Sequence, residues 1–122
     1  MTTASGHTSA IRAKKVIGTE IKDTSGSTIG KVEDIMLDKQ TNNIMYAVVG
    51  FGGFLGVGEK YHPIPWGQLN YNESEGAYVV PYTKEQLKAA PADSLDALTR
   101  DDGYSLRDRT YDYYKAKPYW KN

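Results

Sequence analysis

The sequence contains no cysteine and only two histidines, His7 and His62, among its 122 residues. Without cysteine the chain forms no disulfide, performs no thiol chemistry and holds no cysteine-ligated zinc or iron–sulfur group. The two histidines are far apart in sequence, and no serine near them looks activated, so neither a hydrolase triad nor a two-histidine metal site is indicated. We therefore expect no enzyme activity, no catalytic residue, no metal and no cofactor, and we interpret His62 as a structural, hydrogen-bonded residue.

An excess of charge of one sign is also lacking, since 15 lysines and arginines balance 15 aspartates and glutamates. Nucleic-acid-binding proteins usually carry a basic excess that neutralises phosphates, so the charge balance does not indicate RNA or DNA as a partner. No stretch approaches the about 20 consecutive apolar residues that span a bilayer. Residues 1–15 contain no apolar core of a secretory signal. These absences predict a cytoplasmic protein without a transmembrane segment.

What the chain does contain favours one globular domain, because hydrophobic residues make up 39% of it and charged residues 25%. Residues 1–15 are small and polar, and are predicted to form a flexible arm. Residues 16–90 carry strand-like runs and are predicted to form a β-barrel domain. Residues 91–122 are predicted to form a helical tail rich in aromatic residues.

Five runs of apolar and β-branched residues, separated by turn residues, predict five strands. They span Val16–Lys22, Thr28–Asp38, Ile44–Phe51, Tyr61–Trp66 and Ala77–Tyr82. The first two runs are expected to pair as an antiparallel hairpin, and the last is expected to close the sheet. Residues 67–76 are expected to be a loop.

The second run breaks strict alternation, since Val32 has one parity while Ile35 and Leu37 have the other. Side chains alternate along a strand, so this switch predicts a β-bulge near Glu33–Asp34. The carboxylate of Asp34 is expected to play a structural role by accepting backbone N–H groups.

Two further runs have distinctive compositions. Ile44–Phe51 is almost continuously apolar, which is typical of a central strand covered on both faces. Tyr61–Trp66 contains Pro63 and Pro65, which cannot donate to a ladder, so this strand is expected at an edge of the sheet.

Helical signals follow the strands. Thr83 and Gln86 match a capping box, which predicts a short helix through Leu87–Ala90. Asp93 is expected to cap a further turn. The spacing of apolar residues predicts a weakly amphipathic helix over Ser105–Lys115.

Five motifs follow one another between Val16 and Trp66. They are Val16-Ile17-Gly18, the run Gly26–Asp34, the run Tyr46–Phe51, the run Gly52–Gly56 and Pro63-Ile64-Pro65-Trp66. Their order resembles the PRC-barrel family, named for the cytoplasmic domain of the photosynthetic reaction-centre H subunit. The resemblance implies a mostly β fold, a small antiparallel PRC-type β-barrel with short C-terminal α-helices, in a stand-alone soluble member. It also implies docking and assembly rather than chemistry, and it names no partner.

The glycine-rich residues 50–58 match neither common phosphate-binding motif. Leu55 stands where G-x-G-x-x-G needs its third glycine, and no Gly-Lys-Ser/Thr follows. A tight bend between strands is the favoured interpretation. The alternative is an exposed apolar contact for a partner or a second copy, made by Phe51, Phe54, Leu55 and Val57.

The C-terminal tail gathers aromatic residues. Five of the ten tyrosines lie there together with Trp120: Tyr104, Tyr111, Tyr113, Tyr114 and Tyr119. Interfaces are enriched in tyrosine and tryptophan because these side chains combine a large apolar area with a polar group. Two interpretations stay open, packing of the tail on its own barrel or contact with another molecule. A membrane–water interface is less favoured, because the tail also holds several aspartates.

The sequence thus predicts a non-enzymatic interaction or assembly module that acts through protein–protein contacts and forms a homodimer. The candidate contact residues are Phe51, Phe54, Leu55, Val57, Trp66, Tyr113, Tyr114, Tyr119 and Trp120. The alternative function is a regulatory barrel that binds a small ligand or an anion, using the glycine-rich residues 50–58 and His62.

Overall fold

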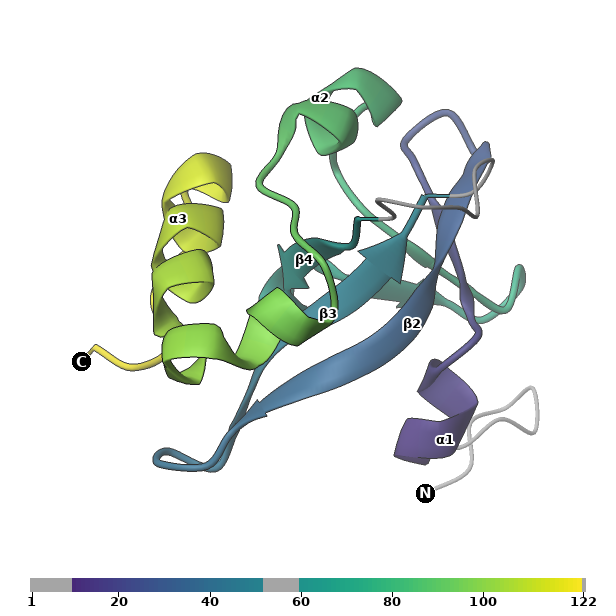
Figure 1. Ribbon diagram of the computed structural model, residues 1–122. Coiled ribbons are helices and arrows are strands. Elements are labelled where there is room, and N and C mark those ends of the chain that lie inside the picture. Colours follow the sequence, from purple (N-terminus) through teal and green to yellow (C-terminus); the bar gives the residue numbers. More distant parts are fainter. Residues whose placement is uncertain (1–9, 52–59, 122) are drawn as a thin grey trace.

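A computed structural model describes residues 10–51 and 60–121, which form a β-sheet with helices packed on it (Figure 1). The strands are β1 (Glu20–Lys22), β2 (Thr28–Asp38), β3 (Asn43–Gly50), β4 (His62–Pro65), β5 (Asn70–Asn72) and β6 (Ala77–Val79). The α-helices are α1 (Ala13–Val16), α2 (Lys84–Ala89) and α3 (Tyr104–Tyr114). Two 3₁₀ helices are η1 (Trp66–Gln68) and η2 (Asp96–Gly103).

The strands form one mixed sheet in the order β4-β3-β2-β1-β6-β5. Neighbouring strands are antiparallel except β1 and β6, which are parallel. The expected closure into an antiparallel barrel is wrong for this sheet, because within the described ranges the outermost strands β4 and β5 do not pair with each other. The last predicted strand, β6, was expected to close the sheet, but its two edges are occupied by β1 and β5. The short helices expected after the strands are present.

The expected first strand, Val16–Lys22, is shorter than predicted. Residues 13–16 form one helical turn, α1, and the hydroxyl of Thr19 donates to the carbonyl of Lys15 at its end (2.8 Å). The strand begins only at Glu20 and pairs with β2 as the predicted antiparallel hairpin. The predicted flexible arm therefore ends in helical residues, while residues 1–9 lie outside the described residues.

Strand β2 has the predicted bounds and the predicted bulge. Its register with β3 shifts between Val32 and Asp34, which lets Val32 and Ile35 face the same apolar cluster although their parities differ. The bulge thus keeps Val32 and Ile35 on the same apolar face of β2.

The centre and one edge of the sheet also confirm the sequence patterns. In β3, Ala47 and Val49 belong to one buried cluster, whereas Tyr46 and Val48 belong to a second. The strand is therefore covered on both faces, as its continuous apolar run predicted. Strand β4, which contains Pro63 and Pro65, lies at an edge, as predicted for a strand with two prolines.

Residues 67–76 were expected to be a loop, but they contain part of η1 and the whole of β5. Strand β5 reads Asn70-Tyr71-Asn72, with one aromatic side chain between two asparagines. Three residues of this composition give no recognisable alternation, so tertiary pairing with β6 decides their conformation.

The capping box at the start of α2 is confirmed, because the Thr83 hydroxyl accepts from the Gln86 N–H and the Gln86 side chain accepts from the Thr83 N–H. The helix predicted over residues 105–115 is confirmed as α3, which packs against β4 and η2. The predicted cap at Asp93 is wrong. The backbone of Asp93 pairs with Tyr61, and the neighbouring Ser94 hydroxyl accepts from the Ala97 N–H (3.4 Å).

Candidate functional site

The predicted contact residues on the sheet side divide into two groups. Phe51 is half-buried, and its ring lies 4.5 Å from that of His62. Trp66 is half-buried at the start of η1, with its ring 5.9 Å from that of Tyr78. The other three, Phe54, Leu55 and Val57, lie outside the described residues.

The four predicted contact residues of the tail all lie against their own chain. Tyr114 is 7% exposed and belongs to the larger apolar cluster, while Tyr113 is 40% exposed and its hydroxyl donates to the Gln86 carbonyl (2.7 Å). Tyr119 and Trp120 are half-buried. The tail packs on its own sheet, which was one of the two interpretations left open by the sequence.

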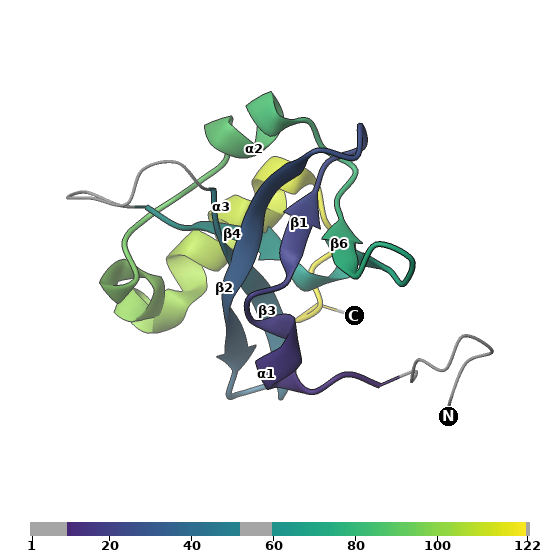
Figure 2. The same ribbon diagram turned by 90° about the vertical axis from the view of Figure 1, so that its right-hand side faces the viewer.

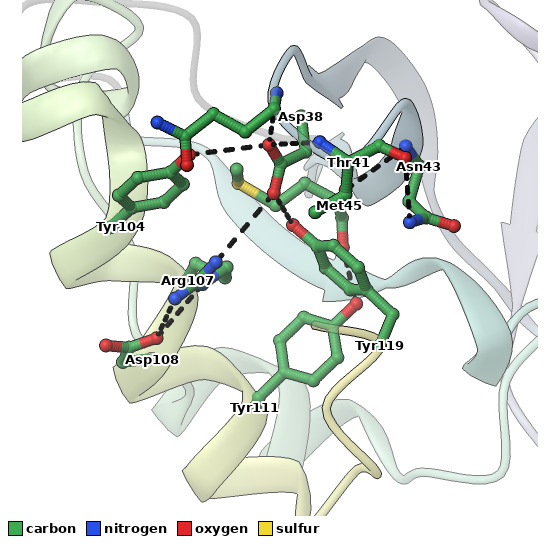
Figure 3. Close-up of polar contacts among 10 residues, drawn as sticks. Asp38, Thr41, Asn43, Met45, Tyr104, Arg107, Asp108, Tyr111 and Tyr119 are labelled. Atoms are coloured by element: carbon green, nitrogen blue, oxygen red, sulfur yellow. Dashed lines mark hydrogen bonds and ion pairs between the residues drawn. The ribbon is translucent and has the colours of Figure 1, made fainter. Parts of the chain in front are cut away.

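A buried carboxylate organises this packing. Asp38, the last residue of β2, is 2% exposed. Its Oδ1 accepts from the backbone N–H groups of Gln40 (2.9 Å) and Thr41 (3.4 Å), which shapes the turn into β3. The Tyr119 hydroxyl donates to Oδ2 at 2.6 Å, and the Tyr104 hydroxyl donates to Oδ1 at 3.4 Å (Figure 3). One side chain thus joins the hairpin turn to the start of α3 and to Tyr119, which follows that helix.

Arg107 of α3 balances the charge of this carboxylate. Its guanidinium lies 3.8 Å from Oδ2 of Asp38 and 2.9 Å from Asp108. It also lies over two aromatic rings, 4.4 Å from the centroid of Tyr104 and 3.6 Å from that of Trp120. A partly desolvated cation over such rings is attracted by their π-electrons. We call the residues Asp38, Tyr104, Arg107, Tyr111, Tyr119 and Trp120 the Asp38 cluster.

Tyr111 fixes the cluster to the sheet. Its hydroxyl donates to the carbonyl of Met45 in β3 at 2.6 Å (Figure 3). Its ring meets those of Tyr119 (5.8 Å) and Trp120 (4.9 Å) at steep angles, the edge-to-face arrangement that aromatic pairs favour. Burial raises the pKa of Tyr111 to about 12, so it remains a hydrogen-bond donor at neutral pH.

The ionisation of Asp38 follows from these contacts. Burial alone would raise its pKa, but the hydrogen bonds from Tyr119, Gln40, Thr41 and Tyr104 outweigh burial and lower the pKa below its usual value. The carboxylate is therefore ionised at neutral pH, with both oxygens engaged by donors. Such an arrangement can hold two chain segments together, and its proton affinity is too low for a good general base at neutral pH.

His62 has a different environment. Burial, and secondarily the charge of Lys60, lower its pKa below the usual value. Its Nδ1 is buried and has no hydrogen-bond partner within the described residues. The hydrogen bond expected for a structural His62 is therefore not found at Nδ1 in that part of the chain, and the ring is held instead by packing against Phe51.

Two clefts flank the Asp38 cluster. The first, of 390 Å³, is lined by Met36, Leu37, Asp38, Lys39, Gln40, Met45, Thr99 and Tyr104. The second, of 460 Å³, lies between the start of β3, η1 and the tail, and includes Trp66, Gln68, Tyr111, Lys117 and Tyr119. Across residues 10–51 and 60–121, no group of three or more histidines or acidic residues is placed to hold a metal ion.

Sequence reasoning missed Asp38 and Arg107. Asp38 begins the turn Lys39–Asn42, and an aspartate in that position commonly accepts from the next backbone N–H groups, so its local role was recognisable. Its contacts with Tyr104 and Tyr119 were not recognisable, because these residues are 66 and 81 positions away.

Comparisons with known proteins agree with the motifs. The family model described as PRC-barrel domain matches residues 9–87. An uncharacterized protein of Deinococcus radiodurans is 25% identical over 109 residues, which cover 84% of this chain and 39% of that protein. The chain thus spans less than half of that relative's length. None of the helices in the described ranges is long and apolar enough to cross a membrane. Because the family model covers more than half of the sequence, the chain belongs to the PRC-barrel domain family.

Proposed function

We propose that this PRC-barrel protein is a non-enzymatic interaction module that acts through protein–protein contacts and forms a homodimer. The observation that carries the proposal is exposed apolar surface at the end of the β2–β3 hairpin. Leu37 is 64% exposed and, with Met36, Met45 and Tyr104, lines the 390 Å³ cleft. Exposed apolar surface of this kind marks contact sites, and methionine side chains adapt readily to a partner.

The contact roles of the nine residues named from the sequence stay predictions. Tyr113 presents the largest exposed fraction among the four in the tail, whereas Tyr114 contributes mainly to the chain's own core. Trp66 lines the second cleft and is open to a partner there. The cytoplasmic location expected from the absence of cysteine also stays a prediction.

Light scattering coupled to size-exclusion chromatography tests the homodimer directly. We expect twice the mass of one chain at high protein concentration and a shift towards one chain on dilution. Point variants are better than deletion of the tail, because deletion would remove Leu106 and Tyr114 from the two buried clusters. The mass of a single chain at every concentration would contradict the homodimer.

A second candidate function is binding of a small ligand or anion. The supporting observation is the 460 Å³ cleft, which falls within the range of about 300–1,000 Å³ typical of ligand pockets. Trp66 offers a ring for stacking, Gln68 an amide and Lys117 an ammonium group. A ligand that binds only the native state raises the melting temperature. Thermal shifts with inorganic phosphate and nucleotides, repeated with Trp66→Ala, test this function, and unchanged melting at millimolar ligand contradicts it.

A further inference from the structure

One edge of β2 is left open over half its length. Strand β1 pairs only with residues 28–31 of β2, and Gly18 and Thr19 extend the backbone bonds to Val32. Beyond this point β3 pairs with β2 as far as Asp38, but within the described residues no strand pairs with the opposite edge. Figures 1 and 2 show this end of β2 running out past β1, with the short helix α1 as the nearest labelled element on that side and no strand of the described residues paired there.

The backbone of this open edge is available for pairing. The N–H of Ile35 donates to the neighbouring Asp34 carboxylate (2.8 Å), so an exposed side chain rather than a strand satisfies this donor. A backbone carbonyl of an incoming strand can accept from the Ile35 N–H in place of the Asp34 carboxylate, and the carboxylate is then free to bind another partner. Open strand edges are common sites for the addition of a further strand.

The side chains along this edge are complementary to those of a second copy that runs in the opposite direction. In chain order the edge carries the acidic Glu33 and Asp34, the apolar Ile35 and Leu37, and then the basic Lys39. An antiparallel copy centred on Met36 places Ile35 opposite Leu37 and brings the acidic end of each strand beside Lys39 of the other. Apolar pairs and opposite charges across antiparallel strands are both stabilising.

We propose that a second copy of this chain pairs antiparallel with the edge formed by residues 33–38 of β2, with Lys39 of the following turn at its end, so that the two sheets become continuous. The inference rests on the proposed homodimer and names its surface. Such a contact uses the same residues on both copies and is closed at two chains. Asp34 of one copy comes opposite Asp38 of the other, but the Asp38 carboxylate is turned into the Asp38 cluster and is 2% exposed. Its charge is already balanced by Arg107.

The test compares two lysine substitutions at exposed positions. Leu37→Lys replaces the exposed apolar side chain in each copy and adds positive charge near Lys39. Tyr71→Lys is the matched control, because Tyr71 is 47% exposed on β5, at the far edge of the same sheet. We expect Leu37→Lys to weaken dimerisation by at least about tenfold, since two buried leucines are lost per dimer. Tyr71→Lys should leave dimerisation unchanged, and circular dichroism should show both variants folded.

A charge exchange tests the register. Lys39→Glu should weaken the dimer because it faces Glu33 and Asp34, and adding Asp34→Lys should restore much of the loss. A dimeric wild type whose mass is unaffected by Leu37→Lys, or is affected by Tyr71→Lys alone, overturns this surface and leaves the homodimer in place. A wild type that stays monomeric at all concentrations overturns the homodimer and this surface together.

Discussion

The Tyr119–Asp38 hydrogen bond should make a measurable contribution to stability. Tyr119→Phe removes one oxygen atom and with it the 2.6 Å bond to the buried carboxylate. The ring remains and keeps its contacts with Tyr111 (5.8 Å) and Trp120 (4.9 Å). Any loss of stability in this variant therefore reports on the contacts of the Tyr119 hydroxyl, its bond to Asp38 and its contact with Arg107.

The expected magnitude follows from the charge and burial of Asp38. A hydrogen bond to a charged group contributes roughly 1.5–3 kcal/mol, about twice the value for a neutral pair. Asp38 retains the donors from Gln40 and Thr41, so it is not left without partners. We therefore expect Tyr119→Phe to lower the free energy of unfolding by about 2 kcal/mol, rather than the larger cost of an orphaned buried charge.

Urea denaturation followed by circular dichroism measures this change, with equal m-values showing that the unfolded states are comparable. Tyr113→Phe is the matched control, because it removes the same atom from a 40% exposed tyrosine whose partner is the neutral Gln86 carbonyl. That variant should lose only about 0.5 kcal/mol. Combining Tyr119→Phe with Asp38→Asn completes a double-mutant cycle, in which we expect a coupling energy of at least about 1 kcal/mol.

Two results would refute the reasoning. The first is a loss in Tyr119→Phe no larger than that in Tyr113→Phe, because the bond to Asp38 would then contribute no more than an exposed neutral one. The second is additivity of Tyr119→Phe and Asp38→Asn, since residues that interact directly are not expected to be independent.

Three further predictions concern backbone contact and pH. Gly30→Ala should lower the free energy of unfolding, measured by urea denaturation, by at least about 2–3 kcal/mol, because the added Cβ would collide with the carbonyl oxygen of Gly50. Gly67→Ala is the control: a Cβ there has no neighbour within 4 Å, so the free energy of unfolding should change by less than about 0.5 kcal/mol. Because burial lowers the pKa of His62, stability should be full above its usual pKa of about 6.5 and fall as the pH drops towards the lowered value, and His62→Gln should remove this slope. The lowered pKa of Asp38 contributes stability that is fully present above the usual pKa of about 3.9 and is lost as the pH falls through the lowered pKa. In that acidic range the urea midpoint of Asp38→Asn should therefore change less with pH than the midpoint of the unmodified protein.

The sheet was predictable where the sequence pattern is local. The bulge after Val32 followed from a change of parity, and the edge position of β4 followed from its two prolines. The capping box at Thr83 needed only a four-residue motif. In each case the physical cause lies within a few residues, so the sequence alone contains it.

The order of the strands in the sheet and the Asp38 cluster were not predictable in this way. Parallel pairing of β1 with β6 joins Ile21 to Tyr78, and no local pattern specifies which edge a short strand will meet. The tail aromatics were recognisable as a group, but their contact with Asp38 depends on a turn far away in sequence. Their packing on the chain itself therefore required the three-dimensional arrangement, and their contact with another molecule stays a prediction.

The Asp38 cluster and the open edge of β2 meet at one residue, and this links stability to self-association. Asp38 ends the edge strand, and in the proposed dimer it faces Asp34 of the second copy. Tyr119 and Arg107 hold its carboxylate away from that contact. Tyr119→Phe leaves Oδ1 bound to Gln40 and Thr41 but removes the donor from Oδ2, which lets two like charges approach across each end of the paired strands and is destabilising. We therefore expect Tyr119→Phe to weaken dimerisation as well as folding, measured by light scattering under native conditions. Tyr113→Phe removes a hydroxyl that donates to Gln86 of α2 and should leave the association constant unchanged. Equal dimerisation of the two variants would show that the tail and the edge act independently.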